Sequence, residues 1–112
     1  MVDTRKKGNT TVRRAIAYYK SQGYLAKDVE KKGRYVKDKD LFGLFDLVVV
    51  GVGFTIYVQV KTNRPATRGP LAAWARQWKH HCHCITWYDR KGFVIQHYCS
   101  DGTIYKEDLR KK

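Results

Sequence analysis

Two short apolar runs joined by a glycine-containing turn constrain the fold of this chain more than any other feature. The runs cover residues 44–50 and 55–61, are rich in β-branched and aromatic side chains, and are separated by residues 51–54. Such runs around a short turn with glycine are typical of a β-hairpin. With 51–54 as the loop, counting outward along the two strands places Asp46 opposite Gln59.

Alternation along the two strands sorts the side chains onto opposite faces of the hairpin. Gln59 and Lys61 point to the same side as Asp46, and these three residues form the polar trio. Five apolar side chains point to the other side: Leu47, Val49, Ile56, Val58 and Val60. A slip of one residue would bury the polar trio in the core, so the hydrophobic pattern itself favours this register.

Length and composition indicate one small domain. The chain has 112 residues, 43% of them hydrophobic, which lies near the low end of the size that buries a self-sufficient core. No run approaches the roughly 18 apolar residues of a membrane span, and the first residues show no signal-peptide pattern. Three cysteines, an odd number, do not fit a closed disulfide framework and favour reduced thiols. We therefore expect a soluble protein.

The charge balance favours a polyphosphate partner. Lys and Arg total 23 against 10 acidic residues, a net charge of +13, and the sequence pI is about 9.9. A pI above ~9 is typical of nucleic-acid-binding domains, whose basic side chains neutralise phosphates. The alternative is a generally basic, soluble surface. Charge does not separate DNA from RNA, and the location expected is the cytoplasm or another DNA-containing intracellular compartment.

Local patterns along the rest of the chain predict an α/β fold. Residues 1–8 are basic without periodicity and are expected to form a flexible arm, with a single domain over 9–112. The expected elements are a helix from Asn9 to the stop at Gly23, a strand over 24–29, a charged connection over 30–40, the hairpin, a helix from Pro70, and a second hairpin over 84–88 and 93–98. The charged C-terminal end is left without an element. The pattern predicts a mixed central sheet flanked by helices, in the order αβββαββ.

Apolar side chains recur at helical spacing in the expected second helix. They are Leu71, Trp74, Ala75 and Trp78, and we expect all four to lie in the core. Base stacking is the alternative role for the two tryptophans, and their place on the apolar stripe favours packing.

This element order, together with segments 43–51 and 58–62, resembles the PD-(D/E)XK nuclease superfamily, especially its archaeal Holliday-junction resolvase branch. The superfamily pattern has an Asp late in one strand and an acidic-X-Lys tripeptide in the next, followed by a helix. Asp46, Gln59 and Lys61 fall on these positions. The resemblance implies a restriction-endonuclease-like core and an endonuclease that hydrolyses DNA phosphodiester bonds with Mg²⁺ or Mn²⁺.

The chemistry of such a nuclease assigns a role to each matched residue. Mg²⁺ prefers hard oxygen ligands, which the Asp46 carboxylate, the Gln59 amide oxygen and the Val60 carbonyl would supply. Lys61 would orient or help to deprotonate the attacking water and offset charge on the phosphate. A cross-strand ion pair between Asp46 and Lys61 is the structural alternative.

Two departures from the family pattern leave the ligand set incomplete. The tripeptide begins with the neutral Gln59, and Val12 stands where the resolvase branch carries a Glu in the first helix. The site either works with fewer charges or borrows a carboxylate from the segment before the hairpin, where the candidates are Asp28, Glu30, Asp38 and Asp40. The competing function is a non-catalytic nucleic-acid-binding module on the same fold.

The expected partner is duplex or branched DNA. Seven basic side chains from the first helix, the charged connection, the loop after the tripeptide and the second helix are expected to contact phosphates: Arg13, Arg14, Arg34, Lys37, Arg64, Arg68 and Arg76. The resemblance also implies a homodimer, because two strands require two active sites.

A run of histidines and cysteines offers a competing zinc site. His80-His81-Cys82-His83-Cys84 is followed by His97 and Cys99, and zinc favours these ligand types. The run crosses from a helix end into a strand, where alternation separates Cys82 and Cys84 from His83. This spacing favours packing over metal binding.

Overall fold

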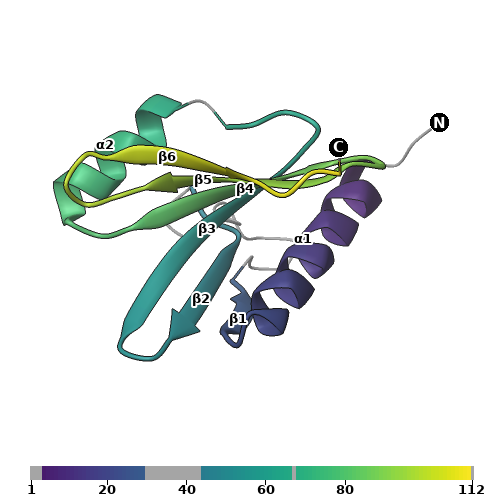
Figure 1. Ribbon diagram of the computed structural model, residues 1–112, viewed down its shortest axis with the longest axis horizontal. Coiled ribbons are helices and arrows are strands. Elements are labelled where there is room, and N and C mark those ends of the chain that lie inside the picture. Colours follow the sequence, from purple (N-terminus) through teal and green to yellow (C-terminus); the bar gives the residue numbers. More distant parts are fainter. Residues whose placement is uncertain (1–3, 30–43, 67, 112) are drawn as a thin grey trace, which may run out of the picture.

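The computed structural model describes residues 4–29, 44–66 and 68–111 and shows a mixed sheet with a helix on either face (Figure 1). The elements in chain order are α1 (Thr4–Ser21), β1 (Leu25–Asp28), β2 (Leu47–Gly51), β3 (Phe54–Thr62), α2 (Arg68–Trp78), β4 (Cys82–Tyr88), β5 (Gly92–Tyr98) and β6 (Ile104–Asp108). The described strands lie in sequence order; among them, the pair β3 and β4, joined through α2, is parallel and the other neighbouring pairs are antiparallel.

The fold class is the one that the sequence predicts, with two corrections to its elements. Helix α1 begins at Thr4, five residues before the start at Asn9 that the sequence predicts. The charged C-terminal end forms β6, a sixth strand paired antiparallel with β5 through Val94↔Asp108 to Tyr98↔Ile104. All five side chains of β6 are exposed, and such a strand lacks the apolar alternation that marks a half-buried strand in a sequence.

The central hairpin has the expected register. Val50 pairs with Thr55, and the ladder continues to Leu47 and Val58. Glycine is favoured in the turn: Gly53 has a φ of 80°, and the exposed ring of Phe54 lies over Gly51, where a Cβ would displace it. The ladder ends at Leu47, so Asp46 lies just beyond it and not within it.

The face of the sheet that packs against α1, the α1 face, holds the larger apolar cluster. Val12, Ala15 and Tyr19 of the helix pack on six buried strand residues: Leu47, Val49, Val58, Ile85, Phe93 and Ile95. Ile56 and Val60 pack against the same cluster, as their alternation predicts. This face therefore provides most of the core.

The opposite face, the α2 face, packs against the shorter helix. Leu71 and Ala75 of α2 are buried on Phe45 and on three strand residues: Cys82, Cys84 and Tyr98. Trp74 packs at the edge of this cluster and is half-buried. The expectation that Trp78 belongs to the core is wrong, because 56% of it is exposed at the end of the helix.

Candidate functional site

The first residue of the polar trio sits at the end of β2, where the regular ladder stops. The Asp46 backbone N–H donates to the Val58 carbonyl at 2.9 Å. Its carboxylate Oδ2 accepts a hydrogen bond from the Val60 N–H at 2.8 Å. The carboxylate thus takes the place of a β2 backbone acceptor for the Val60 N–H of β3, which fixes it against the strand that carries Gln59 and Lys61.

Gln59 carries a buried oxygen without a partner. Among the described residues, its Oε1 is the buried side-chain oxygen or nitrogen that has no hydrogen-bond partner. Leaving such an acceptor unpaired costs ~1–3 kcal/mol. An unpaired buried acceptor beside a carboxylate is the arrangement that a cation would satisfy.

The side chain of Cys84 lies on the same face of the sheet as Gln59 and feels the charges of Asp46 and Lys61. Gln59 pairs with Cys84 in the parallel ladder between β3 and β4, so the two side chains share the α2 face. Burial raises the pKa of the Cys84 thiol, while the charge of Lys61 lowers this pKa and that of Asp46 raises it. Both charges are therefore close to this thiol, and the trio is gathered on one face.

The structure describes two of the positions at which a further carboxylate ligand was sought, Val12 and Asp28. Val12 lies in the apolar cluster of the α1 face with 8% exposure, so the helix position expected to carry a Glu is a packing position. Asp28 pairs with Leu47, which places it on the α1 face. Three further candidates, Glu30, Asp38 and Asp40, lie outside the described residues.

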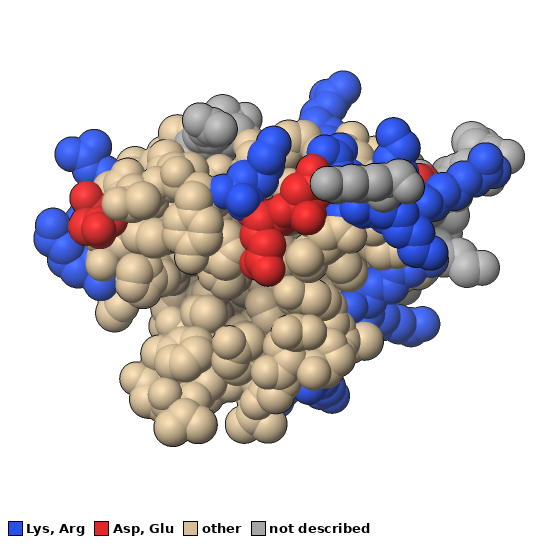
Figure 2. All heavy atoms as spheres, in the orientation of Figure 1, with Lys and Arg blue, Asp and Glu red and all other residues tan. Residues whose placement is uncertain are grey.

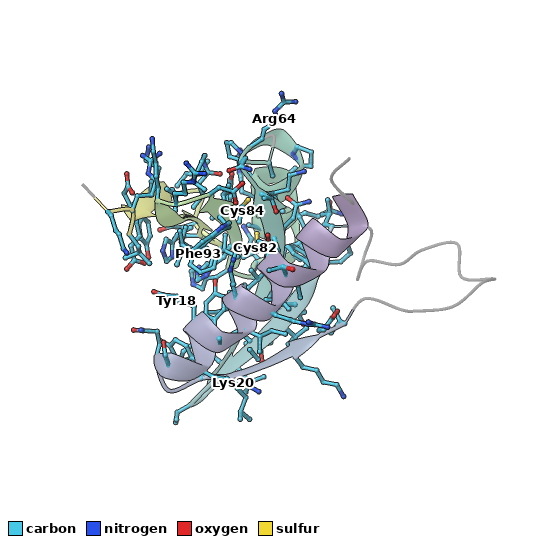
Figure 3. All side chains as sticks on the ribbon, turned by 90° about the vertical axis from the view of Figure 1, so that its right-hand side faces the viewer. Tyr18, Lys20, Arg64, Cys82, Cys84 and Phe93 are labelled. Atoms are coloured by element: carbon cyan, nitrogen blue, oxygen red, sulfur yellow. The ribbon has the colours of Figure 1, made fainter. Side chains whose placement is uncertain are left out.

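Basic side chains flank the end of β3 that carries Lys61. Thr11 of α1 hydrogen-bonds Thr62 through the two hydroxyl oxygens at 2.7 Å, which ties the helix to this end of the strand. The Arg14 guanidinium lies 4.4 Å from the ring centroid of Trp87, a residue paired with Thr62. Arg64 is exposed in the loop that follows, at the end of the molecule opposite Lys20 (Figure 3).

The remaining expected phosphate contacts are spread more widely. Arg13 is exposed on α1, and Arg76 is exposed near the other end of the molecule, close to the turn at Gly102. Arg34, Lys37 and the side chain of Arg68 lie outside the described part of the chain. In the view of Figure 2, Lys and Arg lie mainly around the upper body, and the lower part over β2 and β3 is largely uncharged.

The histidines and cysteines divide between the two faces as alternation predicts. Cys82 and Cys84 are buried on the α2 face, and burial raises the pKa of Cys82 to about 12. His83 lies on the α1 face, where its Nδ1 shares a 2.9 Å hydrogen bond with the Tyr19 hydroxyl. The described residues contain no group of three or more His, Cys, Asp or Glu side chains arranged to hold a metal. All three cysteines are free thiols.

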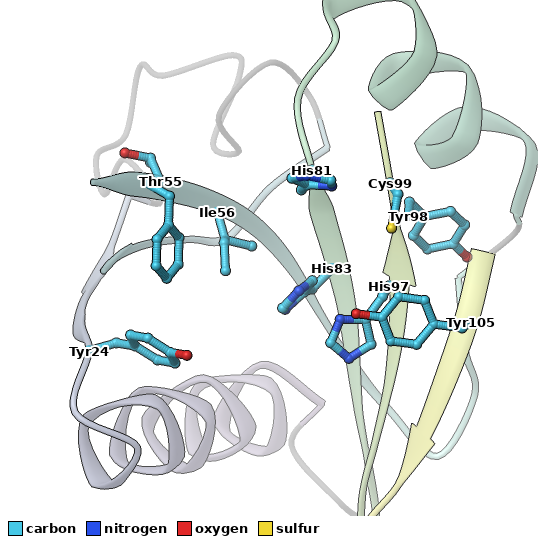
Figure 4. Close-up of a pocket in the computed structure, with 10 residues that line it drawn as sticks. Tyr24, Thr55, Ile56, His81, His83, His97, Tyr98, Cys99 and Tyr105 are labelled. Carbon is cyan, nitrogen blue, oxygen red and sulfur yellow. The ribbon is translucent and has the colours of Figure 1, made fainter. Parts of the chain in front are cut away.

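The α1-face histidines line a pocket of about 470 Å³ that the sequence pattern does not predict. His83 and His97 meet edge to face at 4.2 Å between ring centroids, and His97 stacks on Tyr105 at 4.3 Å. Tyr24 lies across the pocket from them (Figure 4). Burial and the neighbouring His97 and His81 lower the pKa of His83 to about 3, so it is neutral at physiological pH.

Two features of the site lay outside the sequence predictions. Cys84 belongs to the run of histidines and cysteines that the sequence offers as a zinc site. Its parallel pairing with Gln59 depends on the crossover through α2. The Thr11–Thr62 hydrogen bond joins residues 51 positions apart. The signal available in the sequence was a threonine beside Val12 on an otherwise apolar helix stripe, which marks a polar contact without naming its partner.

Comparisons with known proteins support the fold. No family model matches the chain, and no curated protein matches it either. Among solved structures, the chain is similar to Hjc, a Holliday junction resolvase from the archaeal hyperthermophile Archaeoglobus fulgidus, with a TM-score of 0.56 and 15% sequence identity. The match covers 91% of this chain and 88% of that one. Among the described residues, no helix is long and apolar enough to cross a membrane.

Proposed function

We propose that this protein is a divalent-metal-dependent endonuclease of the PD-(D/E)XK type, acting on the phosphodiester bonds of duplex or branched DNA in the manner of a Holliday-junction resolvase. The observation that carries the proposal is the unpaired, buried Gln59 Oε1 on the face where the charges of Asp46 and Lys61 meet. The likeness in fold to a Holliday junction resolvase supports the same reading.

The donor atoms at this site fit Mg²⁺ or Mn²⁺. Asp46 offers a carboxylate held in place by the Val60 N–H, Gln59 offers an amide oxygen that lacks another partner, and the Val60 carbonyl is the third candidate ligand. These are hard oxygen donors, which suit both ions. A bound ion would polarise the scissile phosphate and lower the pKa of a bound water.

Lys61 supplies the cationic group of the proposed site. It is half-buried on the same face as Gln59, two residues further along β3. Its ammonium would orient the attacking water and stabilise the negative charge that builds up on the phosphate. Its removal would therefore reduce turnover more than DNA binding.

The distribution of charge fits a DNA substrate that crosses the end of β3. Arg14 and Arg64 lie toward the end of the molecule that carries Lys61, and the chain has a net charge of +13. Phosphate contacts from such side chains would position the backbone over the polar trio. A homodimer would bring two sites to the two strands of a junction.

A non-catalytic DNA-binding module is the second candidate, favoured by one specific observation. Val12 is a core residue where the related branch carries a helix carboxylate, and Gln59 is neutral. Asp46 is then the one anionic ligand of the proposed set, and the affinity for a divalent ion falls accordingly. Such a module would bind DNA with strong salt dependence and would not cleave it.

Cleavage assays test the proposal directly. Branched, linear and single-stranded DNA are incubated with Mg²⁺ or Mn²⁺, and we expect cleavage of at least one substrate. Asp46→Ala and Lys61→Ala should each lower the cleavage rate by ~10²-fold or more.

A charge-matched control is available at the far end of the molecule. Lys20 is exposed on α1 at the end opposite Arg64, and Lys20→Ala removes one positive charge away from the trio (Figure 3). It should cleave like the parent protein. Cleavage that persists in Asp46→Ala and Lys61→Ala would disprove the site assignment, and failure of the parent protein to cut any substrate would favour the binding module.

A further inference from the structure

A groove lined by aromatic rings opens on the α2 face next to the polar trio. It has a volume of about 550 Å³ and is lined by Tyr57, Trp74, Trp78 and His80, which together form the aromatic groove. Trp78 is 56% exposed and His80 is also exposed. Large exposed aromatic side chains that line one groove are characteristic of binding surfaces.

The inner wall of the groove is held by ring contacts. Trp74 meets Phe45 edge to face at 4.8 Å and Tyr57 at 5.3 Å. The same indole lies 6.1 Å from the ring of His80. Phe45 is fully buried, so Trp74 and Tyr57 are anchored in the core while Trp78 remains open to solvent. The groove therefore has a rigid wall and an accessible aromatic face.

The groove lies on the same face of the sheet as the proposed nuclease centre. Tyr57 and Gln59 are alternate residues on β3 and pair with Cys82 and Cys84 on the same face of the sheet. Alternate residues of a strand are roughly 7 Å apart, and successive nucleotides of one strand rise ~3.4 Å in a duplex. A base in the groove would thus belong to a nucleotide within one or two positions of a phosphate at the trio.

Charge on this side of the molecule suits a nucleic-acid strand. No Asp or Glu occurs between Leu47 and Tyr88, whereas Lys61, Arg64, Arg68, Arg76 and Lys79 do. Arg76 and Lys79 are exposed beside Trp78 at the end of α2. A second copy of the chain would bring its own positive charges to the same place, so charge complementarity favours a polyanion.

We propose that the aromatic groove binds an unpaired nucleobase from the DNA strand whose phosphate occupies the polar trio. Every base has a face that stacks on an aromatic ring, and such stacking contributes without sequence preference. The preferred substrate class is then DNA with unpaired nucleotides beside the cut, such as a branch point or a single-stranded flap. This inference rests on the proposed function for the place of the phosphate, whereas base binding is measured without cleavage.

The test compares two probes that carry the same phosphates. A short oligothymidylate and an abasic oligonucleotide of equal length are titrated by fluorescence anisotropy at fixed salt, with EDTA present so that no metal is bound. We expect the oligothymidylate to bind at least about fivefold more tightly, the lower end of what one stacked base contributes. Trp78→Ala should abolish this preference, and Trp78→Phe should retain part of it.

Phe54→Ala serves as the matched control, since it removes an aromatic side chain that is 45% exposed on the hairpin away from the groove. It should keep the preference. Equal binding of the two probes by the parent protein would overturn the proposal, and so would a preference for the oligothymidylate that survives Trp78→Ala. The proposal would also fail if the parent protein showed no base preference but self-associated in sedimentation, and Trp78→Ala abolished that self-association. A base preference in a protein that cleaves nothing would refute the nuclease and leave the groove assignment standing.

Discussion

The two faces of the sheet are made by the same strands and differ in how completely they are packed. On the α1 face, an 18-residue helix covers an apolar cluster, and the buried polar groups Thr11 and His83 are hydrogen-bonded to Thr62 and Tyr19. On the α2 face, an 11-residue helix leaves Trp78 exposed, and Gln59 Oε1 is buried without a partner among the described residues.

This difference indicates which face provides stability and which face is available for function. On the α1 face the buried polar groups Thr11 and His83 are paired, although a pocket opens beside His83. On the α2 face, the unpaired acceptor and the exposed indole both lose free energy that a ligand would restore. The α2 face also holds the charges of Asp46 and Lys61 around Cys84. We therefore propose that the α1 face mainly provides stability and that the α2 face provides binding.

The largest expected effect is the loss of stability caused by a cavity on the α1 face. Leu47 is fully buried there, and Leu47→Ala should lower the free energy of unfolding by about 3 kcal/mol, within the ~2–5 kcal/mol range of such substitutions. Urea unfolding measures the change. Val52 is 100% exposed, so Val52→Ala should change the stability by less than ~0.5 kcal/mol. Similar losses in the two variants would contradict the assignment of the core.

A pH effect of intermediate size is expected from His83 on the same face. Burial and the neighbouring His97 and His81 lower its pKa from 6.5 to about 3, so the folded state binds a proton less readily than the unfolded chain. The stabilising contribution is complete above pH ~6.5 and is lost as the pH falls from there toward 3, at ~1.4 kcal/mol per pH unit.

Urea unfolding at pH 7.5 and 5.0 would measure this loss. The parent protein should lose about 2 kcal/mol more than His83→Phe over this interval. His80 is exposed, and His80→Phe is the control that should follow the parent protein. Parallel pH profiles of His83→Phe and the parent protein would show that His83 does not titrate as its burial implies.

The smallest expected effect is a gain in stability when the unpaired amide oxygen of Gln59 on the α2 face is removed. Gln59→Met removes the buried acceptor, and we expect the free energy of unfolding to rise by about 1 kcal/mol. The same change at Gln96, whose Oε1 accepts the Tyr98 hydroxyl at 3.0 Å, should lower the stability by a similar amount. Mn²⁺ should stabilise the parent protein against unfolding more than it stabilises Gln59→Met. A loss of stability in Gln59→Met without metal would contradict an unpaired oxygen.

Much of the fold follows from local patterns in the sequence. The register of the central hairpin follows from the alternation of Val49, Val58 and their neighbours around a turn that favours glycine at 51 and 53. The apolar stripe of α1 is likewise local. Strand β6 was missed because an exposed edge strand has no buried side chains to create an alternating pattern. Its backbone pairs with β5, and this pairing is not visible in the sequence.

The candidate site was predicted only in part. Spacing alone gave Asp46, Gln59 and Lys61 as a group, but it placed Asp46 inside the ladder, whereas the strand ends at Leu47 and the carboxylate accepts the Val60 N–H. Helical periodicity placed Trp74 and Trp78 together in the core. Periodicity assigns a direction from the helix axis and does not show where the sheet beneath the helix ends, so it could not identify Trp78 as exposed.

The sequence by itself determined the α/β class, the turn and register of the central hairpin and the basic character of the chain, because these depend on short-range periodicity, backbone restrictions and summed charge. The tertiary structure decided the environment of the polar trio. The parallel pairing of β3 with β4 set Cys84 beside Gln59, and packing of α1 buried Val12 in the apolar cluster. These outcomes depend on contacts between distant segments, and such contacts leave no local pattern in the sequence.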